Sequence, residues 1–249
     1  MSIIEILWPA IVLALALVYI HTIFGVEIIK RGVIFTDLAI GQAAATGMAI
    51  SIAFIDGAYQ TLLSLSFAIT LAIIISWATK KVQNIEAFIG LLYALGISSI
   101  MLILAQSAEG TELFSKLSAS DILFTSADEL YKNLSIYFSV ALVMLFVYPK
   151  LEGTKKEFLF FIMLAVTVTS SVQAAGVLVV FSLLIAPSYA GLVQSRVKPF
   201  TFATFFGSFG ILIAIYLSYN LDLPTGYTII FCIVSSSLVF VSYKSINRV

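Results

Sequence analysis

Residues 11–20 read Ile-Val-Leu-Ala-Leu-Ala-Leu-Val-Tyr-Ile, a run without a charged side chain, and a comparable run occupies residues 177–186. Apolar residues make up 61% of the 249 positions and charged residues 10%. Soluble domains contain about 45–50% and about 25%, so this chain would expose too much apolar surface in water. We therefore predict an integral membrane protein. Because the runs are continuous and do not alternate with polar residues, they predict helices rather than barrel strands.

A helix needs about 20 mainly apolar residues to cross the hydrocarbon core of a bilayer. By this measure the sequence predicts an all-α transmembrane bundle of about nine spans, in a single domain over residues 1–249. The expected spans are residues 8–29, 33–55, 60–79, 86–105, 133–148, 157–171, 173–192, 201–219 and 226–243. The first span follows Met1 without a basic region or a cleavage site, so we interpret it as retained.

Basic residues follow every second span and predict the orientation of the bundle. The clusters are Lys30–Arg31, Lys80–Lys81, Lys150 with Lys155 and Lys156, Arg196 with Lys198, and Lys244 with Arg248. The positive-inside rule places these ends in the cytoplasm, with the N-terminus outside and the C-terminus cytoplasmic. Glu27 is expected to form an ion pair with Lys30 or Arg31. The connection at 106–132 predicts one or two surface helices, with N-caps at Ser120 or Asp121 and at Ser126.

Polar side chains inside the spans are the candidates for function, because ionisable groups are expensive in hydrocarbon. Thr36, Asp37 and Gln42 share the second span, which otherwise consists of small and apolar residues. Asp37 fits either an N-terminal helix cap or a functional carboxylate. Gln42 fits either an interhelical hydrogen bond or a polar position in a path. His21 is the only histidine, so a multi-histidine metal site is excluded and we expect a structural, hydrogen-bonded role.

Several activities are excluded by absent motifs. The sequence has no Gly-x-x-x-x-Gly-Lys-Ser/Thr, so the chain does not bind ATP in the P-loop manner. It also has no metalloprotease signature and no convincing nucleophile with a base. Cys232 is the only cysteine, which excludes an internal disulfide and a cysteine-based metal cluster. The net charge is zero, which gives no indication of nucleic acid. A transporter or channel subunit remains, rather than an enzyme, with no permanently bound cofactor.

Three stretches carry a more specific signal. Residues 173–187 contain Gln-Ala-Ala-Gly-Val-Leu-Val-Val and then Leu-Leu-Ile-Ala-Pro. Residues 218–226 read Ser-Tyr-Asn-Leu-Asp-Leu-Pro-Thr-Gly. Residues 89–96 begin with Ile-Gly and end in Gly, and residues 117–123 follow as Leu-Ser-Ala-Ser-Asp-Ile-Leu. In this order the stretches resemble motifs of the permeases of metal-type (zinc/manganese/iron) ABC importers.

The resemblance implies a multi-pass permease of the plasma membrane that pairs with a second copy as a homodimer. It also implies a dimer of cytoplasmic ABC ATPases and an extracytoplasmic solute-binding protein that delivers the metal. The transport path would pass Thr36, Asp37 and Gln42 of the second span, together with Gln173 and Pro187 of the first motif. A divalent metal ion would be the transported substrate and not a resident cofactor.

Two departures from the family pattern concern these residues. The family's second helix has a histidine where this chain has Gln42, so the expected metal ligands are Asp37 and Gln42, whose oxygen donors suit Mn²⁺, Mg²⁺ or Ca²⁺ better than Zn²⁺. The alternative is that there is no tight site and ions only pass. Residues i and i+5 lie about 140° apart on a regular helix, so both ligands could reach one ion only across a bulge or an unwound turn. The family's coupling helix is reduced to a short loop, in which Leu151, Glu152 and Gly153 are the expected ATPase contacts.

We therefore predict the permease subunit of an ABC transporter that imports divalent metal ions (manganese, zinc or iron), powered by a separate cytoplasmic ATPase. Two alternatives stay open. The short cytoplasmic loop and the sparse metal ligands also fit an ATP-independent ion channel or carrier. The missing histidine also fits an ABC permease for a non-metal or chelate cargo.

Overall fold

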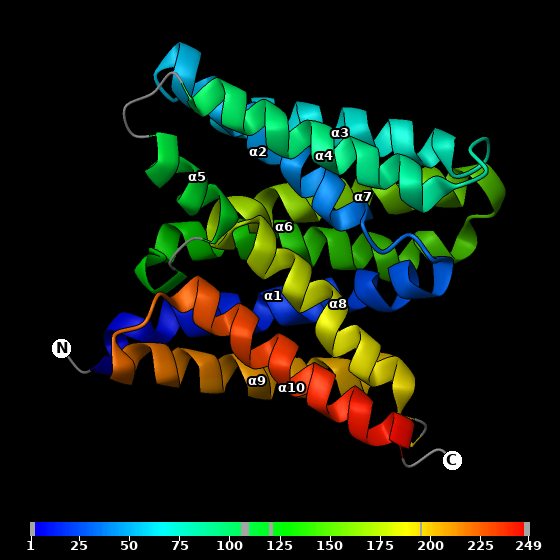
Figure 1. Cartoon of the computed structure of the whole chain (residues 1–249). Coiled ribbons are helices and arrows are strands. Elements are labelled where there is room, and N and C mark those ends of the chain that lie inside the picture. Colours follow the sequence, from blue (N-terminus) through cyan, green and yellow to red (C-terminus); the bar gives the residue numbers. More distant parts are fainter. Residues whose placement is uncertain (1–2, 106–109, 120–121, 195, 247–249) are drawn as a thin grey trace. The chain divides into compact units, whose positions relative to one another are not determined.

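The computed structural model describes residues 3–105, 110–119, 122–194 and 196–246, and within these ranges it is all-helical, as predicted (Figure 1). Its contacts divide the chain into two compact units. Unit 1 consists of residues 1–32, 119–134 and 174–249, and unit 2 of residues 33–118 and 135–173. Each unit is described by itself below. The single permease domain over residues 1–249 stays a prediction.

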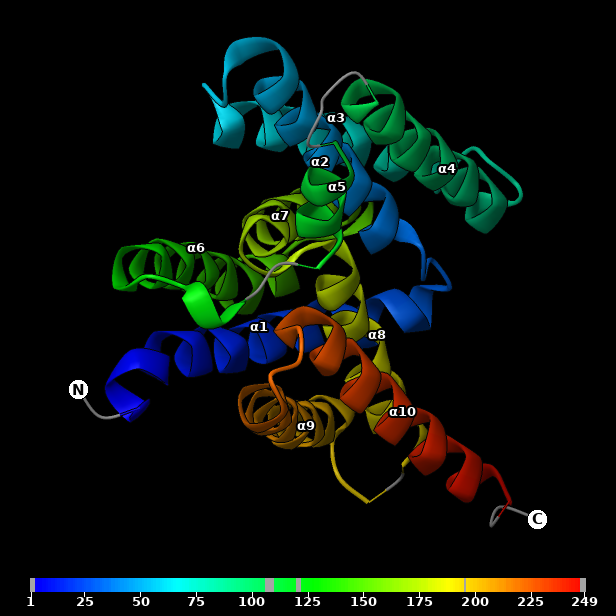
Figure 2. The same ribbon diagram turned by 60° about the vertical axis from the view of Figure 1, so that its left-hand side comes forward.

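In unit 1 the helix α8 is the central element. The unit contains α1 (Ile3–Arg31), η1 (Ile122–Phe124), the start of α6 (Ala127–Phe146), α8 (Val177–Val193), α9 (Pro199–Leu221) and α10 (Thr225–Ile246). The helix α8 packs against α1, α9 and α10, and Figure 2 shows it crossing between them. Ten of its 17 residues are buried, which agrees with the continuously apolar sequence.

In unit 2 the helix α2 has the corresponding place. The unit contains α2 (Thr36–Ile55), α3 (Gln60–Ala78), α4 (Ile85–Leu104), α5 (Gly110–Ser118), the remainder of α6, η2 (Tyr148–Lys150) and most of α7 (Gly153–Ala175). The helix α2 packs against both α3 and α4. The second half of α6 contacts α7, where the Tyr137 hydroxyl is hydrogen-bonded to Ser171 Oγ at 2.9 Å.

The predicted spans correspond to the observed helices. Within the described ranges, eight helices are long and apolar enough to cross a membrane, and the 17-residue α8 is a shorter apolar helix. The fifth and sixth predicted spans were drawn too short, because α6 begins at Ala127 and α7 extends over Gly153–Ala175. A capping box explains the early start of α6: the Glu129 N–H donates to Ser126 Oγ at 3.2 Å, and the Ser126 N–H donates to Glu129 Oε2 at 3.1 Å.

The predicted cap at Ser126 is thus confirmed, although it begins a span rather than a surface helix. The surface helices predicted in the same connection correspond to α5 and η1. Ser120 and Asp121, the other predicted caps, lie outside the described residues. The ion pair predicted for Glu27 is also confirmed, because Arg31 Nη2 lies 3.1 Å from Glu27 Oε1.

Two hydrogen bonds bring three connections of unit 2 together. Lys80 Nζ donates to Thr154 Oγ1 and joins the α3–α4 connection to the start of α7. The Ile34 N–H donates to Glu86 Oε1 at 2.5 Å and joins the segment before α2 to the start of α4. These are connections that the alternation of basic residues assigns to the cytoplasmic side, so their proximity agrees with the span count. The orientation itself stays a prediction.

Close contacts between backbones hold the helices of each unit. In unit 1, a Cβ added at Gly25 of α1 would lie 2.0 Å from the Leu184 carbonyl oxygen and 2.3 Å from Ser188 Oγ. In unit 2, a Cβ added at Gly47 of α2 would lie 2.6 Å from the carbonyl oxygen of Leu63 in α3. Small residues allow such close packing of helices in lipid. Close packing is needed there because apolar side chains gain no hydrophobic free energy by leaving the lipid.

We predict that Gly25→Ala destabilises the protein, because its new Cβ would collide with the α8 backbone. Overpacking of this kind costs roughly 1–3 kcal/mol, so the thermal midpoint in detergent should fall by roughly 3–10 °C. Gly90→Ala in α4 is the matched control, since nothing lies within 4 Å of its added Cβ. The control should be neutral or slightly stabilising, because Ala favours helix more than Gly does. Equal midpoints for the two variants would contradict the close α1–α8 contact.

Candidate transport site

The helix α2 positions the polar residues predicted to line a path. Its sequence is rich in alanine, glycine and other small residues, and 14 of its 20 residues are buried. The helix is continuous from Thr36 to Ile55, and Phe35 occupies the N-cap position without a side-chain cap. Thr36 and Asp37 therefore lie in the first turn, where the macrodipole favours negative charge.

Asp37 is an isolated carboxylate at the start of this helix. Its side chain is 1% exposed, and neither Oδ1 nor Oδ2 has a hydrogen-bond partner in the structure. The neighbouring Thr36 hydroxyl is also buried without a partner. The capping interpretation of Asp37 is therefore not supported, because Phe35 is the N-cap residue and the carboxylate accepts no backbone hydrogen bond. An ionised carboxylate without partners is costly in an apolar environment, so this position favours binding of a cation or a proton.

Gln42 points away from Asp37 around the same helix. The described α2 has no bulge or unwound turn between them, so the two residues remain about 140° apart. Gln42 packs on α4, where a Cβ added at Gly96 would lie 2.7 Å from the Gln42 Cβ. The backbone carbonyl oxygen of Gln42 accepts a hydrogen bond of 2.7 Å from Thr46 Oγ1. Within one copy, α2 does not bring Asp37 and Gln42 to a common ion.

The two path candidates outside α2 lie in different units. Gln173 is in the last turn of α7 in unit 2, and its Nε2 is buried without a hydrogen-bond partner. Pro187 is buried inside α8 in unit 1. A Cβ added at Gly207 of α9 would lie 3.1 Å from the Pro187 ring. The helix α8 continues on both sides of Pro187. Pro187 thus serves the packing of α8 on α9, and its role in a path stays a prediction.

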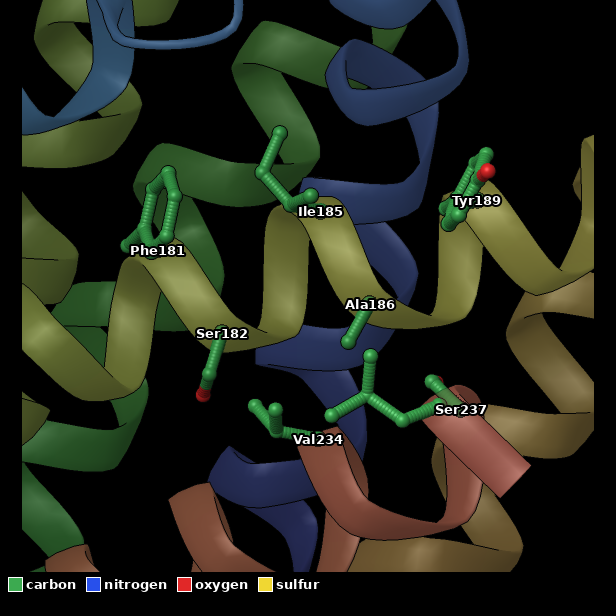
Figure 3. A pocket seen from close by; sticks show the side chains of 8 residues that line it. Phe181, Ser182, Ile185, Ala186, Tyr189, Val234 and Ser237 are labelled. Carbon is green, nitrogen blue, oxygen red and sulfur yellow. The ribbon is translucent and has the colours of Figure 1, made fainter. Parts of the chain in front are cut away.

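A groove between α8 and α10 in unit 1 is unsuited to a bare cation. Its empty volume is about 460 Å³, and Figure 3 shows its lining side chains. It is lined by Phe181, Ser182, Ile185, Ala186, Tyr189, Val234, Ser237 and Leu238. These side chains are apolar or carry a hydroxyl group, and none is a carboxylate or an imidazole. The groove therefore offers apolar surface and no charge to compensate a metal ion.

No preformed metal cluster accompanies Asp37. In the described part of the chain, no three His, Cys, Asp or Glu side chains are grouped closely enough to hold a metal ion. His21 is fully buried, and its Nδ1 lies 2.8 Å from the Leu17 carbonyl oxygen one turn earlier in α1. This contact agrees with the structural, hydrogen-bonded role predicted for the histidine. A cation at Asp37 would thus need water or a second molecule for its other ligands.

The predicted coupling residues lie in a short turn between η2 and α7. Leu151 is extended and half-buried, Glu152 is exposed, and Gly153 is exposed with a φ of +56°. The turn is flanked by a cation–π contact in which Lys156 Nζ lies 4.9 Å from the centre of the Tyr148 ring. It has no α-helix of its own, as the sequence indicated. Its contact with an ATPase stays a prediction.

Several motif residues have structural roles that the sequence did not reveal. Gly96, the last residue of the Ile-Gly segment, allows the close contact with Gln42, and Gly176 precedes α8 with a φ of +86°. Ser218 Oγ donates to the Leu223 carbonyl oxygen at 2.7 Å and closes the turn between α9 and α10. Sequence reasoning missed Glu86, which holds the segment before α2. Its signal was an acidic residue at the membrane boundary of the fourth predicted span.

Comparisons with known proteins agree with this arrangement. Residues 148–244 match the model of the ABC 3 transport family. The manganese transport system membrane protein MntC of Listeria monocytogenes is 24% identical over 95% of this chain and 89% of its own length. A chain of PsaBC from Streptococcus pneumoniae, in complex with Fab, superposes with a TM-score of 0.77 at 18% identity, over 94% of this chain and 90% of its own. A proposed metal-chelate type ABC transporter in an inward-facing conformation superposes with a TM-score of 0.72 at 13% identity, over 95% and 85%.

The fold and these similarities are those of a multi-pass membrane protein that resembles the permease subunits of ABC transporters. The resemblance predicted from the sequence motifs is confirmed: residues 148–244 are similar to the ABC 3 transport family, and the whole chain is similar to membrane proteins of manganese transport systems. Its place is the plasma membrane.

We predict that Gln42→His raises the apparent affinity of the transport path for Zn²⁺, because imidazole binds zinc better than an amide does. The substitution keeps the Cβ that packs on Gly96, so α2 and α4 should stay in contact. Competition by Zn²⁺ against uptake of a second divalent ion measures the effect. Gln83→His, at an exposed position before α4, is the control. If both variants respond to zinc alike, Gln42 does not line the path.

Proposed function

We propose that this chain is the membrane-spanning subunit of an ABC importer for divalent metal ions. A separate dimer of cytoplasmic ATPases would drive it, a second copy would complete the path, and an extracytoplasmic solute-binding protein would deliver the ion. The proposal rests on one observation above all: the carboxylate of Asp37 is buried in a transmembrane helix without a protein partner. A passing divalent cation would compensate this charge for as long as it stays.

Manganese is the ion that we expect first. Asp37 supplies a carboxylate, and Thr36 beside it supplies a hydroxyl. No group of three His, Cys, Asp or Glu side chains that could hold a metal ion occurs in the described ranges. Oxygen donors of this kind suit Mn²⁺ better than Zn²⁺. The relatives named for manganese transport support the same choice. Iron and zinc would then bind as competitors at higher concentration.

A site with few protein ligands suits transport better than storage. Tight coordination by a full set of ligands would hold the ion against release, whereas conduction needs binding weak enough to leave. One carboxylate supplies charge compensation, and water molecules retained by the ion fill the remaining positions. The absence of a histidine at Gln42 is consistent with this weak binding. The solute-binding protein would then supply the selectivity that the path itself lacks.

The test is reconstitution of the chain with its ATPase and its binding protein in proteoliposomes. We expect Mn²⁺ uptake that requires ATP and the binding protein, and ATP hydrolysis that both components stimulate. Uptake by the chain alone without ATP would instead identify a channel or carrier. ATP-dependent uptake that excess Mn²⁺, Zn²⁺ and Fe²⁺ do not inhibit would identify a chelate or another organic cargo.

We predict that Asp37→Asn lowers the rate of Mn²⁺ uptake at least about tenfold while the complex still assembles. The amide has nearly the same size but no charge, so it cannot compensate a divalent cation. Asp56→Asn, in the exposed turn after α2, is the matched control, since Asn tolerates the left-handed φ of +50° at that position. Uptake measured with a manganese-sensitive dye inside vesicles distinguishes the two. Normal uptake by Asp37→Asn would remove the carboxylate from the mechanism.

We predict that Leu151→Asp disrupts the functional contact between the permease and the ATPase. Leu151 is the apolar member of the coupling turn, and a charged residue there would not pack into an apolar pocket of the ATPase. The variant complex should lose most of its binding-protein-stimulated hydrolysis and its uptake, while the thermal midpoint of the isolated permease stays within about 2 °C. Lys150→Asp, one residue earlier and exposed, controls for charge alone. Equal loss in both variants would speak against a specific role of Leu151.

A further inference from the structure

Glu86 occupies a position that neither the motifs nor the comparisons assign. It lies in the first turn of α4, after the N-cap residue Asn84. Its Oε1 accepts a hydrogen bond of 2.5 Å from the backbone N–H of Ile34, and its Oε2 is buried without a partner. Glu86 is 52 residues away from Ile34 in the chain, so this contact is tertiary and not a helix cap.

The segment that Glu86 holds leads directly into the candidate site. Ile34 belongs to the turn before α2, in which the Thr36 N–H donates to the Val33 carbonyl oxygen at 3.1 Å. Asp37 follows three residues after Ile34. The helix α2 lacks a side-chain cap at Phe35, so only backbone hydrogen bonds close this end locally. The Glu86 carboxylate therefore adds a tertiary restraint on the segment that leads into the first turn.

Two contacts hold the helix α4 and the connection before it, which carry Glu86. The helix α4 packs against α2 at Gly96, where an added Cβ would lie 2.7 Å from Gln42 Cβ. The α3–α4 connection is joined by Lys80 to Thr154, the residue that follows the coupling turn. All of these contacts lie within unit 2. Glu86 thus belongs to a fixed part of the unit and can restrain the segment before α2.

We propose that Glu86 is a positioning residue for Asp37, which it holds in place through the backbone of Ile34. The inference rests on the proposed function, since it gives Asp37 the role of the cation-binding carboxylate. Without the hydrogen bond, the first turn of α2 would open more often and Asp37 would occupy its binding position for less of the time. The apparent affinity for the cation would fall although every ligand is still present.

Hydrogen exchange of the segment at residues 33–38 tests the proposal without cargo or ATPase. Glu86→Ala removes the acceptor, and the exchange of these amides should accelerate about 10- to 100-fold, as expected for loss of a charge-assisted hydrogen bond. Glu86→Gln keeps an acceptor oxygen at the same reach, so its exchange should stay close to that of the unaltered protein. Asp128→Asn, an exposed acidic residue in the first turn of α6, should change nothing at residues 33–38.

Transport kinetics provide the second measurement. In the reconstituted complex, Glu86→Ala should raise the KM for Mn²⁺ about tenfold or more with the amount of folded protein and the maximal rate preserved, and Glu86→Gln should restore the KM. A fall in folded protein with an unchanged KM would show a purely structural role and overturn the proposal. Unchanged exchange in Glu86→Ala would overturn it as well, whatever the transport result. If Glu86→Ala accelerates exchange as expected but the unaltered complex takes up no Mn²⁺, the result would instead refute the proposed function.

Discussion

Close approach between backbones is the constraint on which the rest of this structure depends. In lipid, an apolar side chain gains little by leaving the hydrocarbon, so helices associate through dense packing and polar contacts. Gly25 brings α1 onto α8, Gly47 brings α2 onto α3, and Gly96 brings α4 onto α2. Each contact lies on a helix that its own unit surrounds, namely α8 or α2. The positions of glycine thus decide which helix becomes the centre of each unit.

The same packing determines what the central helices can carry. The helix α8 is lined by neighbours on three sides and presents apolar side chains and hydroxyls, so it serves as a structural core. The helix α2 packs against α3 and α4, is also largely buried, and contains a carboxylate in its first turn. The helix α8 contains no carboxylate, so the two buried helices differ in this group. That group, Asp37, is the reason why we propose a path along α2.

Hydropathy predicted the helices well, because span length and apolar composition follow from the thickness of the bilayer. It failed where a helix extends beyond its apolar run: α6 begins at Ala127 through the capping box of Ser126 and Glu129, in a polar segment. The likeness of the motifs to a family predicted the class of protein. It did not predict that Gly96 and Ser218 have packing and turn-forming roles, because such contacts join residues far apart in the chain or depend on φ and ψ.

The site was predictable in its members and not in its geometry. Most hydroxyl groups in these spans donate to a carbonyl oxygen three or four residues earlier, as Thr46 does to Gln42, so a polar residue inside a span need not indicate a path. Asp37 has no such local partner, because an ionised carboxylate cannot donate to a carbonyl oxygen and the Asp37 carboxylate accepts no hydrogen bond in this structure. Its partner must come from outside the helix. Glu86 is an acidic residue that does accept a hydrogen bond from a backbone donor, the N–H of Ile34. It lies close enough in the fold to restrain the turn that carries Asp37.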